Sequence, residues 1–75
     1  MYKKMQSIKR LIDKKLFKVA EKEIIIICKD CKLKYILEYL KNNEINKNNI
    51  IDVYNDVITD LYYYNYITTT EANSL

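Results

Sequence analysis

The segment that decides the fold is Glu23-Ile-Ile-Ile-Ile-Cys28, which continues as Lys29-Asp-Cys31. Four β-branched residues in succession crowd the side chains of a helix, but they suit a strand that is covered on both faces. We therefore expect a central strand over 23–28. After it, the apolar spacing changes to steps of three and four, which predicts a helix over 31–42; the apolar positions are Leu33, Ile36, Leu37 and Leu40.

The residues before this segment predict a basic, amphipathic helix from Tyr2 to about Lys22. Its apolar residues recur in steps of three and four and form one stripe; they are Met5, Ile8, Ile12, Leu16 and Val19. Residues 1–22 carry eight Lys and Arg against two Asp and Glu, a net charge of +6. Residues 50–75 carry four acidic and no basic side chains, so the two ends of the chain have opposite charge.

The residues after the predicted helix leave two interpretations open. An Asn-rich stretch over 42–49 is typical of a loop, because Asn tolerates turn conformations. In one interpretation, 50–54 forms a strand and a short helix follows from Asp56. In the other, Asn49 caps a single helix that runs to Tyr64, with Asp52 as its third residue. A short strand is then expected over 66–70 and a frayed end over 71–75.

The order of these elements predicts a small α/β protein with one domain, since 75 residues suffice for one core. The domain spans 1–75 and consists of a basic amphipathic helix over 1–22, a βαβ core over 23–70 that contains the two cysteines, and a tail over 71–75. Alternating strands and helices imply parallel strand pairing. The alternative fold is a mostly helical bundle.

The composition excludes several kinds of site. The chain has no Gly, Pro or His. It therefore lacks glycine-rich phosphate loops, histidine general bases and zinc sites that combine Cys with His. Its longest apolar run, Ile24–Cys28, has five residues, whereas a membrane-spanning helix needs about 20. We expect no membrane segment and a cytoplasmic location, where thiols are normally reduced.

The two cysteines, Cys28 and Cys31, are the candidate catalytic residues. If Cys31 begins a helix, free backbone N–H groups and the helix dipole would lower its pKa and make it the nucleophile. Cys28 at the end of the strand would then resolve the mixed disulfide. The alternatives are that both thiols pack as small apolar side chains, or that they bind a metal shared between two chains. No metal and no cofactor is expected.

The stretch from Glu23 to Cys31, followed by 32–45 and 50–54, resembles the thioredoxin and glutaredoxin family. That resemblance implies a βαβ fold and thiol-disulfide exchange with a partner protein, although this chain has no Pro, which the family uses in its thiol motif and opposite it. Residues 32–40 and 50–61 are similar to the small cytoplasmic thiol oxidoreductases of poxviruses. That likeness implies a disulfide relay in the host cytoplasm, with a sulfhydryl oxidase or a glutaredoxin-like protein as partner.

Two functions from different classes follow. The first is a thiol-disulfide exchange protein that relays a disulfide between partners through Cys28 and Cys31. The alternative is a small, non-catalytic interaction or inhibitor module of a virus or phage, which would use the basic helix or the Tyr-rich segment 62–66. A nucleic-acid partner is not expected, because Asp52, Asp56 and Asp60 would repel phosphate. Homodimerisation stays open.

Overall fold

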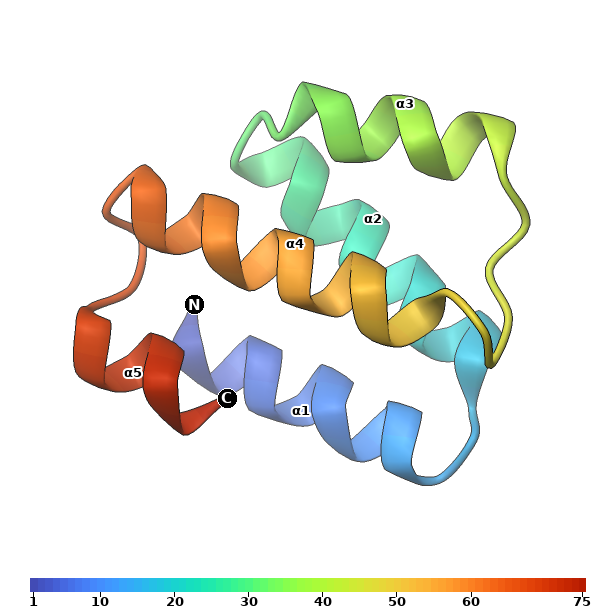
Figure 1. The fold of residues 1–75 in the computed structure, drawn as a ribbon, viewed down its shortest axis with the longest axis horizontal. Helices are drawn as coiled ribbons and strands as arrows, with labels where there is room; N and C mark the ends of the chain where they lie inside the picture. The colour runs from blue at the N-terminus through green and yellow to red at the C-terminus, as the bar shows by residue number, and fades with distance from the viewer.

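The chain folds into five helices and contains no strand, as a computed structural model that describes all 75 residues shows (Figure 1). The α/β prediction is therefore wrong, and so is the resemblance to the thioredoxin and glutaredoxin family, which implied a βαβ fold. The weaker likeness to the poxvirus thiol oxidoreductases is not supported either. The helical-bundle alternative is confirmed. The helices are α1 (Tyr2–Asp13), α2 (Phe17–Asp30), α3 (Lys34–Asn42), α4 (Ile50–Tyr63) and α5 (Thr69–Ser74).

The predicted strand over 23–28 lies inside α2. The buried residues of α2 are Ala20, Ile24, Ile27 and Cys28, and their spacing of three and four is helical. A β-branched residue costs a helix at most about 0.7 kcal/mol relative to Ala. Burying an isoleucine contributes about 1.5–3 kcal/mol. Burial of one face of α2 therefore outweighs the strand preference of the four isoleucines.

The other predicted strands are also absent. Residues 50–54 begin α4, which follows Asn49 and ends at Tyr63, so the single-helix interpretation is confirmed. The Asn49 side chain makes no capping bond to this helix and bonds within the preceding loop instead. The segment 66–70 contains the turn after α4 and the first two residues of α5. The frayed end predicted over 71–75 is wrong as well. Thr68 and Glu71 form a reciprocal capping box that starts α5.

The predicted helix over Tyr2–Lys22 is divided into α1 and α2 by a turn after Asp13. The N–H of Leu16 donates to the carbonyl of Leu11 at 2.9 Å, and the N–H of Lys15 donates to the carbonyl of Ile12 at 2.9 Å. This pair of bonds is the Schellman motif, which requires a left-handed residue. Lys15 supplies it with a φ of 62°.

Helices α2 and α4 end in the same motif, with Lys32 (φ 57°) and Asn65 (φ 65°) in the left-handed position. A helix end of this kind usually carries Gly, which this chain lacks. The residue after the left-handed one, Leu16 or Leu33, also serves as the N-cap of the next helix. Because one turn ends a helix and begins the next, α1, α2 and α3 follow each other with very short links.

We expect Lys32→Gly to raise the free energy of unfolding by about 1 kcal/mol, because the left-handed conformation is strained for Lys and not for Gly. The side chain of Lys32 is exposed, so its removal breaks no packing. Urea unfolding followed by circular dichroism measures the change. The matched control is Lys29→Gly in the last turn of α2, which should destabilise by roughly 0.5–1 kcal/mol. Equal destabilisation by both substitutions would contradict the assigned helix end.

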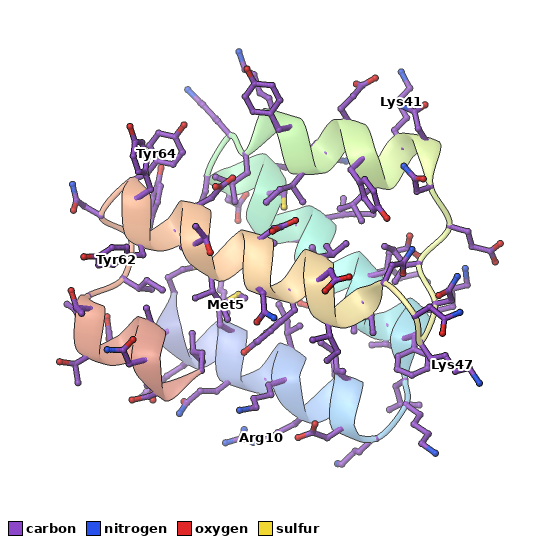
Figure 2. All side chains as sticks on the ribbon, viewed as in Figure 1. Met5, Arg10, Lys41, Lys47, Tyr62 and Tyr64 are labelled. Carbon is purple, nitrogen blue, oxygen red and sulfur yellow. The ribbon has the colours of Figure 1, made fainter.

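The core lies where α4 crosses α1 and α2, with α3 and α5 packed at the two sides (Figure 1). All 19 buried residues are hydrophobic and belong to one cluster. Tyr54 is the buried residue with a polar tip, and its hydroxyl donates to the carbonyl of Met5 at 3.1 Å. Met5 itself points from α1 into the space below α4 (Figure 2). This bond fixes α4 against α1 without leaving a buried polar atom unpaired.

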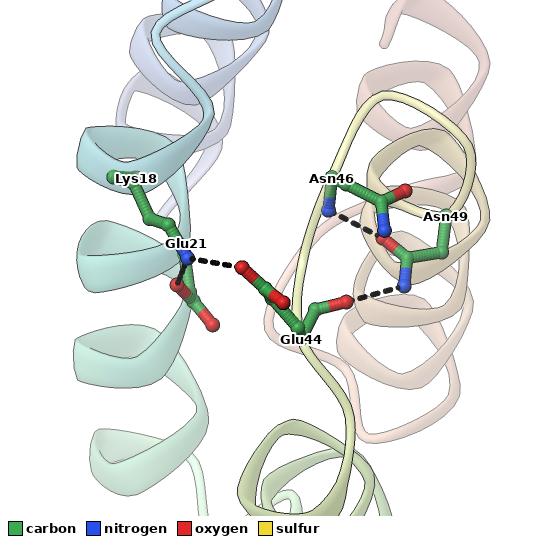
Figure 3. Close-up of polar contacts among 5 residues, drawn as sticks. All are labelled: Lys18, Glu21, Glu44, Asn46 and Asn49. Atoms are coloured by element: carbon green, nitrogen blue, oxygen red, sulfur yellow. Dashed lines mark hydrogen bonds and ion pairs between the residues drawn. The ribbon is translucent and has the colours of Figure 1, made fainter.

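The loop between α3 and α4 lies where the Asn-rich sequence predicted it, and asparagine side chains hold it in place (Figure 3). The Oδ1 of Asn49 accepts from the N–H of Asn46 at 2.8 Å, and its Nδ2 donates to the carbonyl of Glu44 at 2.8 Å. Lys18 on α2 pairs with Glu44 at 3.5 Å and with Glu21 at 3.9 Å. The loop is thus tied to the first turn of α2.

Candidate functional site

The two predicted site residues lie at the carboxyl end of α2. Cys28 is in the last turn of the helix, and Cys31 is the residue that follows the helix. The prediction that Cys31 begins a helix is therefore wrong. The carboxyl end of a helix carries partial negative charge, which disfavours a thiolate. The structure does bring the two cysteines to the same helix end, three residues apart. Both are free and buried, with 0% and 6% of their surface exposed.

The surroundings of both thiols favour the protonated form. Burial raises the pKa of Cys28 to about 12, and the charges of Cys31 and Asp60 act in the same direction. Burial also raises the pKa of Cys31, with Asp30 adding to the effect, while the amino group of Met1 and Lys4 oppose it. A reactive thiol needs the opposite shift. The arrangement is that of packed thiols, and the catalytic role of the pair stays a prediction.

The packing at the end of α2 accounts for the spacing of the two cysteines without a catalytic role for either thiol. The N–H of Leu33 donates to the carbonyl of Cys28 at 2.8 Å, which closes the Schellman motif of α2. This motif usually pairs an apolar residue after the helix with one in the last helical turn. Leu33 and Cys28 occupy these two positions and are buried in the same core. Cys31, between them, is the C-cap residue and is also part of that core.

High pH should destabilise the protein through Cys28 and Tyr54. The pKa of Cys28 rises from 9.0 to about 12 on folding, and burial raises the pKa of Tyr54 from 10.0 to about 12. Above pH 9 the unfolded chain binds fewer protons than the folded chain, so stability falls as pH increases towards 12. We expect urea unfolding to show a steeper loss of stability between about pH 8 and pH 10 for the wild type than for Cys28→Ala. Equal slopes would show that Cys28 titrates normally in the folded state.

No three side chains of Cys, Asp or Glu lie together in a way that could hold a metal ion. None of the five helices combines the length and the apolar character needed to cross a membrane.

A surface groove between α1 and α2 is the second candidate site. The two helices run in opposite directions, as the short turn at Lys14–Leu16 requires (Figure 1). The groove has a volume of about 540 Å³. Buried Ile8 and Ile27 line it, together with Leu11, Val19 and Ile26. Val19 and Ile26 are 46% and 47% exposed, so the wall formed by α2 offers apolar surface to a ligand.

Charged residues form the rim of this groove. Lys4 and Arg10 lie on α1, Lys14 directly follows α1, and Glu23 lies on α2 between the two exposed apolar residues. Arg10 points away from the body of the protein (Figure 2). The ion pairs of the protein are those of Lys18 with Glu21 and Glu44, so the three cations of the rim have no acidic partner. The groove therefore combines an apolar surface with an uncompensated positive side.

Sequence patterns missed this groove because they placed its residues in the wrong elements. Val19 was expected on the apolar stripe of one long helix, and Ile26 was expected in a covered strand. The sequence does contain a signal for them, which is a second apolar stripe on the same helix. Val19 and Ile26 are seven residues apart, or about two helical turns, and they lie on a different face from Ala20, Ile24 and Ile27.

A third surface consists of the tyrosines at the end of α4. Tyr62, Tyr63, Tyr64 and Tyr66 are between 47% and 75% exposed, so none of them is in the core. The rings of Tyr63 and Tyr64 pack edge to face with 5.1 Å between their centroids. Tyr62 and Tyr64 extend outward where α4 ends (Figure 2).

No protein-family model, curated protein or solved structure matches the chain significantly.

Proposed function

We propose that this protein is a small, non-catalytic protein–protein interaction module that binds its partner in the groove between α1 and α2. The observation that carries the proposal is the apolar wall formed by Val19 and Ile26, each almost half exposed beside a floor of buried isoleucine. An apolar surface with a polar rim is typical of a site where another protein docks.

The state of the thiols supports binding over thiol-disulfide exchange. An exchange protein must present a thiolate to the disulfide of its partner. Here burial raises the pKa of both cysteines, and neither side chain is exposed beyond 6%. The groove, by contrast, is open to the surface, and two apolar side chains of its α2 wall are exposed.

The test compares proteins that differ at the thiols or at the groove. Immobilised wild type, Cys28→Ala/Cys31→Ala, Ile26→Lys and Ile51→Lys are used to capture proteins from a lysate of the source cells, with quantitative mass spectrometry as the readout. Ile51→Lys is the matched control, because Ile51 on α4 is 50% exposed and lies outside the groove. Circular dichroism verifies that each variant is folded.

We expect the alanine double variant and Ile51→Lys to capture the same proteins as the wild type. Ile26→Lys should reduce that capture about tenfold or more, which corresponds to about 1.4 kcal/mol of binding free energy. Capture that depends on the two cysteines and is indifferent to Ile26→Lys would overturn the proposed function.

A further inference from the structure

We infer that the groove between α1 and α2 binds one amphipathic helix whose flank towards α1 is acidic. This inference rests on the proposed function and specifies the kind of partner. Three features of the groove support it: its shape, its charge and the state of the backbone in its walls.

The groove has the dimensions and lining of a site for a helix. Its walls are helices of 12 and 14 residues, and a helix rises about 1.5 Å per residue, so the walls are about 18–21 Å long. Its apolar residues are distributed along both walls and the floor between them. A helix with apolar residues at positions i, i+3 or i+4, and i+7 presents an apolar stripe about 10 Å long, which fits within the length of these walls.

An extended segment would fit this groove less well than a helix. Strand addition requires free backbone N–H and C=O groups at the edge of a sheet. The walls here are helices whose backbone groups bond within each helix, and the structure contains no strand. A helix has already formed its own backbone hydrogen bonds. It therefore loses fewer hydrogen bonds to water than an extended segment does when it enters the groove.

The charges of the rim specify the two flanks of the bound helix. Lys4 and Arg10 on α1 and Lys14 just after it line one side of the groove, and no carboxylate of this chain forms an ion pair with them. Acidic side chains on the facing flank would complement all three. Glu23 on the opposite wall favours a basic or neutral residue on the other flank. Exposed pairs of this kind contribute to specificity and association rate more than to affinity.

The concave shape and the position of Glu23 favour a helix over an anionic membrane. A membrane surface is flat and uniformly negative, so Glu23, which is exposed beside Val19 and Ile26, would face lipid phosphates and repel them. A single helix can avoid this repulsion, because its two flanks can differ in charge.

The experiment selects ligands from a displayed library of helical peptides of about five turns. Apolar residues are fixed at i, i+3 and i+7, and the flanking positions are random. Selection is made on the wild-type protein. Fluorescence anisotropy then measures the selected peptides against Ile26→Lys and against Arg10→Glu/Lys14→Glu. The controls are Ile51→Lys and Lys41→Glu/Lys47→Glu, which change exposed residues outside the groove.

We expect Asp and Glu to be enriched over Lys and Arg on one flank of the selected peptides. The two groove variants should weaken binding about tenfold or more, and the two controls should leave it within about twofold. Selected peptides without an acidic flank, or binding that is insensitive to the groove variants, would overturn the inference. A third outcome would also overturn it: no peptide is selected, but the protein binds vesicles of phosphatidylcholine with phosphatidylserine, and Arg10→Glu/Lys14→Glu abolishes this binding.

The same variants separate this inference from the proposed function. If peptide selection shows no acidic preference while Ile26→Lys still abolishes capture of proteins from the lysate, the groove binds a partner of another shape or charge. In that case the inference is wrong and the proposed function stands. If Ile26→Lys leaves capture unchanged, both are wrong.

Discussion

Leu33→Ala should lower the free energy of unfolding by about 2–5 kcal/mol, the range for a fully buried leucine. Leu33 is 2% exposed, donates its N–H to Cys28 and precedes the first residue of α3. The substitution leaves a cavity where α2 ends and α3 begins. A protein of 75 residues has a total stability of about 4–11 kcal/mol, so this single change could remove about half of it. Urea unfolding at neutral pH measures the loss.

The matched control for Leu33 is Leu16, which holds the same position in the turn between α1 and α2. Leu16 also donates its N–H across a Schellman motif and is also the N-cap of the next helix, but it is 46% exposed. Leu16→Ala should therefore cost less than about 1 kcal/mol. Similar losses for the two substitutions would contradict the different burial of the two turns.

In the native protein, Cys28 and Cys31 should react with a thiol reagent at least about a hundredfold more slowly than in the urea-unfolded chain. A buried thiol reacts only after the structure opens, and each 1.4 kcal/mol of opening free energy slows the reaction tenfold. Cys28 should react more slowly than Cys31, because Cys28 lies within α2 and is 0% exposed, whereas Cys31 follows the helix and is 6% exposed. Alkylation followed by mass spectrometry gives the rate at each cysteine.

An exposed cysteine introduced by Ser74→Cys into the Cys28→Ala/Cys31→Ala background provides the reference rate, since Ser74 is exposed on α5. The reference should react at the rate of an unstructured thiol. If Cys31 in the wild type reacts at neutral pH as fast as this reference, its thiol is accessible, and the thiol-disulfide exchange function regains its physical basis.

Apolar periodicity predicted the parts of the fold where local preference and burial agree. The stripe through Met5, Ile8 and Ile12 is buried on α1, and Ile36 and Leu40 are buried on α3. The Asn-rich loop follows where the stripe of α3 ends. In these segments the helical spacing is supported by residues that favour helices or loops, so the pattern and the propensity lead to the same structure.

The errors arose where propensity and burial compete. Four successive isoleucines favour a strand, but their outcome depends on what covers them, which is decided by contacts with α1 and α4. The sequence has neither Gly nor Asn at the turns after Asp13 and Asp30, so the usual marker of a left-handed helix end is missing there. Lys15 and Lys32 adopt the left-handed conformation instead. The remaining sequence signal for these two turns is an apolar residue, Leu16 or Leu33, that directly follows a lysine at the end of an apolar stripe.

The candidate site could be predicted only as a list of residues. The spacing of Cys28 and Cys31 is the same for an exposed redox pair and for a packed helix end, so sequence alone could not decide their burial. The direction of the pKa shifts depended on whether Cys31 begins or ends a helix. That in turn depended on the conformation of the isoleucines before it.

The conformation of Ile24–Cys28 decides both the burial of the thiols and the shape of the groove. The most direct measurement is the set of ¹³Cα chemical shifts of the isotopically labelled protein in solution. We predict helical shifts without interruption from Phe17 to Asp30, a break at Lys32 with its positive φ, and helical shifts again over Ile50–Tyr54. Extended shifts over Ile24–Cys28 and Ile50–Tyr54, with contacts between the two segments, would contradict the helical fold and the function proposed from it.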